Sequence, residues 1–432
     1  MDPEIMTDTI VHDHGEDGID RRGFLKCMAW AGTGALWVMQ SGVLRSMPLT
    51  GTPGDAAALK GGLFFAQISD SHIGFSKEAN PDVTATLQAA VDRLNGQGRR
   101  PAFVLHTGDI SQLSKPTEFD TADQVIKGIR TERVFYVPGE HDVLGDNGKQ
   151  YLARYGRKTR GDGWYSFDHS GVHFVGLVNV LNLKPGGLGS LGAEQLAWLK
   201  RDLAGHPAST PIVVFAHVPL WTVYPDWGWG TDDSEQALAL LRRFGSVTVL
   251  NGHIHQVMQK VEGNVAFHTA LSTAFPQPAP GTAPSPGPLK VEPARLRSLL
   301  GLASVTYHQG QHSLAIVDQA LAPAPAGIAA AAPAGAQRDS FAAGPAVVGG
   351  ARVIRIDNFS FLPPELHVPK GGKVMWINGD DVPHLIVSAD QRFRPSSALD
   401  TNDQYTLTLE QPGNYPYFCS LHPKMTGRIV VE

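Results

Sequence analysis

The sequence of 432 residues predicts an α/β domain followed by a small all-β sandwich. From Leu63 onward, short apolar runs alternate with amphipathic segments, which indicates buried strands connected by helices. After an Ala/Pro/Gly-rich stretch at 322–350, the pattern changes to short alternating strands separated by Pro and Gly turns. Such a chain exceeds one typical core. We therefore expect a leader over 1–60, an α/β domain over 61–321, a linker over 322–350 and a β-sandwich over 351–432.

The first segment resembles an export signal. Arg21-Arg22-Gly-Phe-Leu-Lys26 precedes a weakly hydrophobic stretch interrupted by glycines, as in signals of the bacterial Tat route for folded proteins. The alternatives are an amphipathic surface helix or a membrane anchor, although the stretch is short for a spanning helix. We expect a mature start between 46 and 60, no permanent membrane span after removal of the signal, and a periplasmic or extracellular location.

Charge and cysteine usage narrow the class further. The formal net charge is −5 and no Lys/Arg-rich face is evident, which argues against binding of duplex nucleic acid. Only Cys27 and Cys419 are present, and the first falls in the expected leader. The lone remaining cysteine is a ligand, a reactive thiol or a buried filler, and its neighbours decide which.

Within the α/β domain the pattern predicts each element in turn. The hairpin strands 164–169 and 172–179 turn at Ser170-Gly171, antiparallel strands follow at 257–262 and 265–271, and a strand at 312–317 closes a sheet edge. The predicted helices span 81–95, 116–129, 192–204, 234–244 and 293–302.

Five blocks of metal-binding residues each follow an apolar run that reads as a buried strand. Strand ends are where an α/β protein gathers side chains from distant parts of the sequence. Carboxylates and imidazoles together are typical ligands of a pair of first-row divalent ions. The blocks are Asp70-Ser-His72, Gly108-Asp109, Gly139-Glu140-His141-Asp142, His217 and Gly252-His253-Ile-His255.

This chemistry suggests a role for every carboxylate and imidazole of the five blocks. A bridging carboxylate from Asp109 holds two cations together. The ligands expected to complete one ion are Asp70, His72 and His255; those expected to complete the other are His217, His253 and Glu140. His141 faces the leaving group as a hydrogen-bond donor or general acid, and Asp142 orients that imidazole.

The order of these blocks resembles the calcineurin-like metallophosphoesterases over about 63–320, and most closely their cyclic-nucleotide and purple-acid-phosphatase-like branch. The resemblance implies a four-layer α/β/β/α sandwich that holds two divalent or mixed-valence ions (Fe, Mn or Zn). It also implies hydrolysis of a small phosphomonoester or phosphodiester, with a nucleotide or small diester slightly favoured. The alternative is a set of structural histidines and aspartates at turns.

Two positions depart from the family pattern. Glu140 replaces an asparagine, which adds negative charge and should raise the pKa of the attacking water. Gln112 stands where purple acid phosphatases place a tyrosine ligand. Either Glu140 is a ligand that offsets the missing tyrosinate, or it turns away and one ion binds weakly.

Other candidates near the site are less specific. His106 reads as a supporting or core histidine, whereas His173 and His268 alternate with apolar residues and read as structural. The aromatic loop 219–231, directly after His217, either stacks a base or aryl group at the pocket mouth or packs on itself.

The β-sandwich carries a second ligand set. His384 lies in an upstream loop, and Cys419, His422 and Met425 follow as Cys-x-x-His-x-x-Met between the last two strands. Two histidines, a cysteine and an axial methionine are the ligands of blue-copper electron-transfer sites. The pattern resembles the cupredoxins over about 351–432, with an amicyanin-like ligand loop, and implies a Greek-key sandwich with one copper ion. Zinc is the alternative metal.

These observations predict an exported phosphoesterase fused to a copper domain. The competing hypothesis is a copper-binding or electron-transfer protein on a degraded esterase scaffold, which only Glu140 supports. A third hypothesis is that copper occupancy or redox state gates hydrolysis. The ring edge of His422 is the expected docking point for a redox partner or for the first domain.

Overall fold

The computed structural model describes residues 35–40, 43–48, 62–181, 183–308, 314–324 and 347–432. The chain divides into two compact units, Met1–Lys60 and Gly61–Glu432. In the first unit, β1 (Ala35–Gln40) and β2 (Val43–Pro48) pair antiparallel. The twin arginine of the expected export signal lies outside the described residues, as does most of the linker. Among the described residues, no helix combines the length and apolar character that a membrane crossing requires.

The second unit begins with two mixed β-sheets, ordered β10-β11-β9-β8-β7-β6 and β13-β12-β3-β4-β5. The strands β7, β8, β9 and β11 run parallel, as do β3, β4 and β5, and antiparallel strands flank them. The strands span Leu63–Ile68 (β3), Val104–His106 (β4), Val134–Tyr136 (β5), Tyr165–His169 (β6), Val172–Gly176 (β7), Ile212–Phe215 (β8), Val247–Asn251 (β9), Gln259–Glu262 (β10), Val265–Thr269 (β11), Gly301–Tyr307 (β12) and Ala315–Ala320 (β13).

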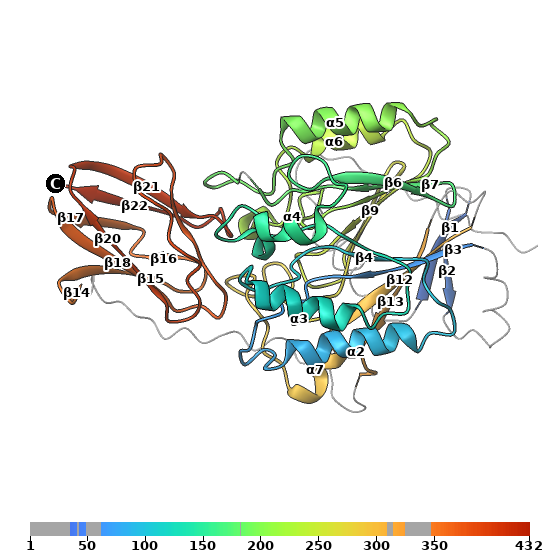
Figure 1. The fold of residues 1–432 in the computed structure, drawn as a ribbon, viewed down its shortest axis with the longest axis horizontal. Helices are drawn as coiled ribbons and strands as arrows, with labels where there is room; N and C mark the ends of the chain where they lie inside the picture. Colours follow the sequence, from blue (N-terminus) through green and yellow to red (C-terminus); the bar gives the residue numbers. More distant parts are fainter. Residues whose placement is uncertain (1–34, 41–42, 49–61, 182, 309–313, 325–346) are drawn as a thin grey trace, which may run out of the picture. The chain divides into compact units, whose positions relative to one another are not determined.

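Helices cover the outer faces of both sheets. Figure 1 shows α5 and α6 on one side and α2, α3 and α7 on the other, with the sheets between them. Helix α2 is amphipathic and buries Leu87, Val91 and Leu94 against the sheet. The helices span Val83–Asn95 (α2), Pro116–Ile126 (α3), Lys149–Tyr155 (α4), Ala193–Ala204 (α5), Ser234–Leu241 (α6) and Pro293–Leu299 (α7), with short 3-10 turns at Glu140–Val143 (η2) and Pro225–Trp227 (η3).

The two sheets pack face to face through fully buried aromatic residues. Phe65 of β3 meets Phe174 of β7 edge to face, with ring centroids 5.4 Å apart. Phe103 stacks on Phe65 at 5.1 Å, and Phe215 of β8 belongs to the same cluster. Each fully buried side chain of this kind contributes roughly 1.5–3 kcal/mol. The four-layer α/β/β/α architecture is therefore confirmed.

The predicted elements occur near their expected bounds, and one observed helix has no predicted counterpart. The helix predicted over 293–302 ends at Leu299, because β12 begins at Gly301 and pairs with β3 and β13. Helix α4, between the hairpin and η2, was not predicted. The predicted edge strand 312–317 corresponds to β13, which lies at the sheet edge as expected and ends at Ala320; residues 312 and 313 lie outside the described residues.

The C-terminal residues form a two-sheet β-sandwich, as predicted. One sheet has the order β14-β15-β18-β20, with β16 on β15, and the other has the order β17-β22-β21-β19. Trp376 and Tyr417 lie buried between them. The strands span Val347–Val348 (β14), Ala351–Ile356 (β15), Phe361–Leu362 (β16), Glu365–Val368 (β17), Gly372–Asn378 (β18), Ile386–Ser388 (β19), Gln404–Leu409 (β20), Gly413–Cys419 (β21) and Thr426–Val431 (β22).

Candidate metal centres

The first centre assembles where strands of both sheets end. Asp70 and His72 follow β3, Asp109 follows β4, and the 3-10 turn η2 after β5 begins at Glu140. From the second sheet, β8 ends just before His217, and His253 and His255 follow β9. The two sheets bring these ends together because their central strands run parallel within each sheet.

The seven expected ligands form two adjacent groups that share Asp109. Asp109 Oδ2 lies 3.5 Å from His72 Nε2 and 3.2 Å from His217 Nε2, so one carboxylate oxygen faces both groups. The first group contains Asp70, His72 and His255; the second contains Glu140, His217 and His253; in each group the donor atoms lie within 4.8 Å of one another. This is the arrangement expected of a carboxylate-bridged pair of ions.

Glu140 faces into the centre. Its carboxylate oxygens lie 2.9 Å from His217 Nε2 and 2.9 Å from His253 Nδ1. Burial opposes ionisation, but the two imidazoles hold the pKa of Glu140 well below its ordinary value. The side chain therefore presents a charged oxygen at the position where the family pattern has a neutral amide.

We expect Glu140→Asn to weaken metal retention and to shift the rising limb of the pH–rate profile to lower pH. Removing one negative charge strengthens the pull of the cations on the attacking water, and a shift of about one pH unit corresponds to ~1.4 kcal/mol. Elemental analysis and pH–rate profiles of the metal-loaded variant test this expectation. The exposed Glu235→Gln on α6 is the matched control. Unchanged metal content together with an unchanged profile would rule out a ligand role for Glu140.

Three ligand imidazoles are oriented by oxygen acceptors behind them. Because a carbonyl oxygen accepts only, Nδ1 must carry the proton and Nε2 presents its lone pair to the centre. The pairs are His72 Nδ1 with Gln112 Oε1 (2.9 Å), His217 Nδ1 with the Thr107 carbonyl (2.7 Å) and His255 Nδ1 with the Phe275 carbonyl (2.6 Å).

The donor set fits two divalent cations. Asp70 Oδ2, Glu140 Oε2 and His217 Nε2 are buried and make no hydrogen bond, although the last two atoms lie 2.9 Å apart. In addition, the Nε2 atoms of His72 and His255 face each other at 3.2 Å. Buried polar atoms without partners are costly, and a coordinated cation satisfies such converging lone pairs.

The backbone at the centre is held in an unusual conformation. Five of the seven ligands have left-handed backbone angles. They are Asp70 (φ 52°), His72 (φ 42°), Asp109 (φ 52°), His253 (φ 71°) and His255 (φ 52°). Such conformations cost roughly 1–3 kcal/mol each and persist only where the surroundings enforce them. Close approach also explains Gly139, where an added Cβ would lie 2.0 Å from Asp109 Oδ1.

The structure places His141 at the centre but gives Asp142 another task. The His141 ring lies 4.7 Å from that of His72, and its Nδ1 lies 2.8 Å from the Gln112 carbonyl. The carboxylate of Asp142 instead accepts hydrogen bonds from the backbone of Ile110, Ser111 and Gly139 and from the Ser111 hydroxyl. The expectation that Asp142 orients the imidazole is therefore corrected: Gln112 does so, because η2 points the Asp142 side chain back toward the end of β4.

The remaining histidines are held by groups outside the centre. His106 Nε2 lies 2.8 Å from Ser71 Oγ, which makes it a supporting residue next to a ligand block. His268 Nε2 pairs with Asp318 at 3.0 Å. His173 sits between Asp168 (2.9 Å) and Asp202 (2.8 Å), as a structural histidine would.

The paired His173 predicts a pH-dependent contribution to stability. Burial alone lowers its pKa, but hydrogen bonds to Asp202 and Asp168 raise the pKa above the ordinary value. The stabilisation is thus complete below the unfolded-state pKa near 6.5 and is lost as pH rises through the folded-state value. We expect His173→Gln to cost about 1–3 kcal/mol at pH 5.5 and less at pH 9, measured by urea unfolding. An equal cost at both pH values would contradict this.

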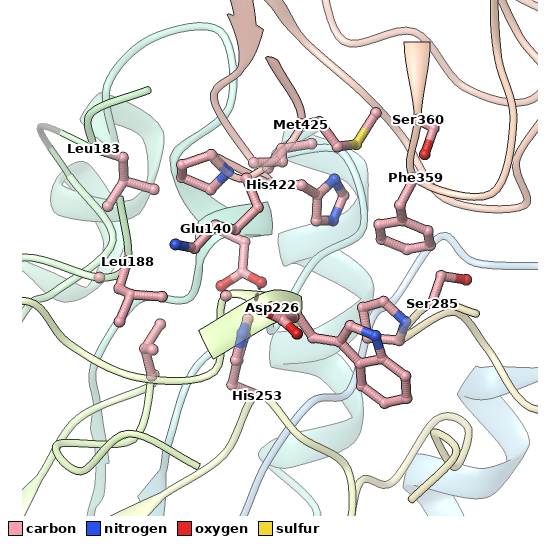
Figure 2. A pocket seen from close by; sticks show the side chains of 18 of the residues that line it. Glu140, Leu183, Leu188, Asp226, His253, Ser285, Phe359, Ser360, His422 and Met425 are labelled. Carbon is pink, nitrogen blue, oxygen red and sulfur yellow. Dashed lines mark ion pairs between the residues drawn. The ribbon is translucent and has the colours of Figure 1, made fainter. Parts of the chain in front are cut away.

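A cavity of about 310 Å³ opens beside the centre. Figure 2 shows Glu140 and His253 on one wall, and His422, Met425 and Phe359 of the β-sandwich on another. The aromatic loop both borders the cavity and packs on itself, and the stacking of a base or aryl group on it stays a prediction. Trp227 lines the cavity, whereas Trp229 is buried and packs against it at 5.0 Å.

The second centre lies in the β-sandwich, where the donor atoms of one cysteine and two histidines come together. Cys419 Sγ lies 3.5 Å from His384 Nδ1 and 3.6 Å from His422 Nδ1, and the two nitrogens are 3.3 Å apart. Both imidazoles lower the pKa of the Cys419 thiol well below its ordinary value, although burial opposes ionisation. Met425 is buried in the same apolar cluster as Cys419. A thiolate and two imidazole nitrogens fit a type 1 copper ion.

Sequence reasoning missed two supporting residues. Asp380 Oδ2 lies 2.9 Å from His384 Nε2 and so fixes the tautomer that presents Nδ1 to the metal. The sequence feature that could have indicated this role is the position of Asp380, an acidic residue four positions before His384. The sequence distinguishes Gln112 only by the absence of a phenolate, whereas in the structure its side chain and its carbonyl orient His72 and His141.

Comparison with known proteins gives a separate match for each centre. Residues 65–257 match the calcineurin-like phosphoesterase family and residues 333–431 match the cupredoxin-like domain. Amicyanin from Paracoccus versutus is 35% identical over 92 residues, covering 20% of this chain and 68% of that protein. Glycerophosphodiester phosphodiesterase GpdQ from Enterobacter lignolyticus is 28% identical over 228 residues (50% of this chain, 79% of that protein). A probable cyclic nucleotide phosphodiesterase from Rhodopseudomonas palustris is 26% identical over 190 residues (43% and 69%).

Proposed function

Because the chain belongs to the calcineurin-like phosphoesterases through its first domain and to the cupredoxins through its second, we propose that it is an exported binuclear-metal phosphodiesterase with a fused copper site. The observation that carries this proposal is the pair of ligand groups sharing Asp109. Similarity to two proteins named as phosphodiesterases favours a diester over a monoester.

The side chains divide the work of hydrolysis. Two cations, when bound by the seven ligands, supply an activated water and neutralise negative charge on the phosphate. His141 holds a proton on Nδ1 against the Gln112 carbonyl, which leaves Nε2 free to exchange a proton. As imidazolium it protonates the leaving alkoxide from Nε2 and returns to the neutral tautomer that the carbonyl favours.

The test is turnover after reconstitution with Mn, Zn or Fe. We expect bis(p-nitrophenyl) phosphate to be cleaved with a higher kcat/KM than p-nitrophenyl phosphate, with elemental analysis showing two ions per α/β domain. A higher kcat/KM for the monoester would make the chain a phosphatase. Absence of turnover with every metal would favour the competing function, an electron-transfer protein on an inactive scaffold.

The candidate copper site supports either electron transfer or regulation of hydrolysis by copper. Its specific support is the set of two imidazoles and a buried thiolate, with Asp380 behind His384. Redox titration of the copper-loaded chain, followed by visible absorption, tests for reversible electron transfer.

Export by the Tat route is supported by the sequence alone. We expect the full chain to appear in the periplasm of a Tat-competent bacterium, and the Arg21→Lys, Arg22→Lys double variant to remain in the cytoplasm. Fractionation with a Tat-deficient strain as control distinguishes this route from export of unfolded chains.

A further inference from the structure

The β-sandwich is anchored to the rim of the hydrolytic cavity. The Gly186 amide donates a hydrogen bond to the carbonyl of Pro423, within the copper-ligand loop, at 2.6 Å. The Ser285 hydroxyl donates to Asn358 Oδ1 at 2.6 Å. Leu144, which follows η2 directly, packs into the apolar core of the sandwich. Two of these contacts involve parts of the sandwich close to the candidate copper site: Pro423, in the loop that carries the copper ligands, and the turn at Asn358.

That turn is strained and places Phe359 at the cavity. Asn358 (φ 51°) and Phe359 (φ 56°) both have left-handed backbone angles, which a bulky side chain rarely adopts. The carboxylate of Asp380 holds the turn, because it accepts hydrogen bonds from the amides of Asn358 (2.5 Å) and Phe359 (2.9 Å). Strain of this kind is concentrated at functional sites. Figure 2 shows the Phe359 ring between His422 and Ser285.

The same carboxylate supports the copper centre. Asp380 Oδ2 lies 2.9 Å from His384 Nε2, so a single side chain joins a copper-binding imidazole to the turn. The Phe359 ring also lies directly against both imidazoles, 4.7 Å from that of His422 and 5.6 Å from that of His384, measured between ring centroids. Phe359 is therefore in contact with two candidate copper ligands, His384 and His422, and is held by the carboxylate that hydrogen-bonds to one of them.

Another part of the cavity borders the candidate binuclear centre, where we expect the phosphate to bind. Glu140 and His253 line that part, and Trp227 and Leu188 contribute apolar surface along with Phe359. The volume of about 310 Å³ accommodates a phosphoryl group with one ring of phenyl size. An aromatic ring prefers to pack against aromatic side chains edge to face or offset.

We propose that Phe359 contacts the substrate and that copper, by ordering the Asp380-held turn, raises the affinity of the pocket for phosphoesters with an aromatic alcohol. This inference rests on the proposed function and names a substrate class and a regulator for it. Copper on Nδ1 of His384 fixes Nε2–H as the donor to Asp380 and ties that imidazole to the loop of Cys419 and His422. When Phe359 and its turn are already ordered by copper, binding of the substrate costs less conformational entropy.

The test uses the full chain with Zn in the binuclear site, with phenylphosphonate as probe and methylphosphonate as matched ligand. We expect copper to tighten phenylphosphonate binding by about tenfold, measured by calorimetry, and to change methylphosphonate binding less than twofold. By reciprocity, phenylphosphonate must tighten copper binding by the same factor. Competition with a chelator, followed by the copper–thiolate absorption, measures this without any assay of turnover.

Variants separate the coupling from general damage. Phe359→Ala should abolish the tenfold ratio, and Asp380→Asn should reduce it. The control Phe393→Ala, a partly buried ring packed near Trp376 in the same domain, should retain it. Equal phenylphosphonate affinity with and without copper, a wild-type ratio in Phe359→Ala, or no phenylphosphonate binding in either form would overturn the proposal.

The outcomes distinguish this inference from the hydrolase assignment. If the protein cleaves bis(p-nitrophenyl) phosphate but copper does not change its affinity for phenylphosphonate, the coupling is rejected and the hydrolase assignment stands. If copper changes the affinity for phenylphosphonate but no metal supports turnover, the coupling stands and the hydrolase assignment is rejected.

Discussion

Asp109→Asn is expected to reduce kcat/KM for bis(p-nitrophenyl) phosphate by about three orders of magnitude, or ~4 kcal/mol of barrier. The reason is that Asp109 Oδ2 faces His72 at 3.5 Å and His217 at 3.2 Å, so one oxygen serves both ligand groups. An amide has the same shape but only one acceptor oxygen and no charge. Loss of the bridge should release at least one metal ion.

The measurement pairs kinetics with elemental analysis of the same preparation. Asp92→Asn, an exposed carboxylate on α2, is the control and should retain wild-type metal content and turnover. Because Asp109 also accepts the backbone N–H of His141 at 2.9 Å, thermal unfolding of the metal-free proteins separates a folding defect from lost metal. Two bound ions with near-normal turnover would show that Asp109 is not the bridge.

Cys419→Ser is expected to abolish the strong visible absorption of the copper-loaded chain. It should also lower copper affinity more than about 100-fold, beyond the effect of losing an outer partner. The thiolate is the strongest of the three donors, and the neighbouring imidazoles lower the pKa of its thiol. Serine fills nearly the same buried volume but offers a poor ligand for copper, so the fold should persist while the site is lost.

Met425→Leu is the matched comparison, because it alters only the weak axial position. We expect it to keep the absorption and to shift the reduction potential. Visible spectra and chelator competition of both variants give the result. Retained copper–thiolate absorption in Cys419→Ser would mean that another sulfur, or another site, holds the copper.

Much of the α/β fold could be predicted because short stretches of sequence, each read by itself, indicate the central strands. Apolar runs mark the central strands, and the ligand blocks directly follow them, so topology alone brings Asp70, Asp109 and His217 together. The failures also have physical causes. The run around Gly301 is apolar enough for either a helix or a strand, and pairing with β3 decides it. Helix α4 is too short to carry a clear period.

Sequence reasoning also reached its limit at the site. The seven candidate ligands follow from residue type and spacing, and the structure brings them together, but the hydrogen-bond partners behind them depend on backbone direction. η2 turns Asp142 toward the end of β4, and a backbone carbonyl, which no motif specifies, holds His141. The position of Phe359 depends on contacts between residues far apart in sequence, and no pattern in the chain indicated it.

The left-handed ligand positions have a consequence for anyone who engineers this protein. The usual ways to stabilise a fold relieve backbone strain, and glycine or asparagine at a positive φ is the standard choice. At Asp70, His72, Asp109, His253 and His255 that choice would remove candidate metal ligands. A stability screen carried out without metal would therefore select against function at these five positions. Variants should be screened with the metal ions bound, so that selection for folding stability and selection for catalysis favour the same residues.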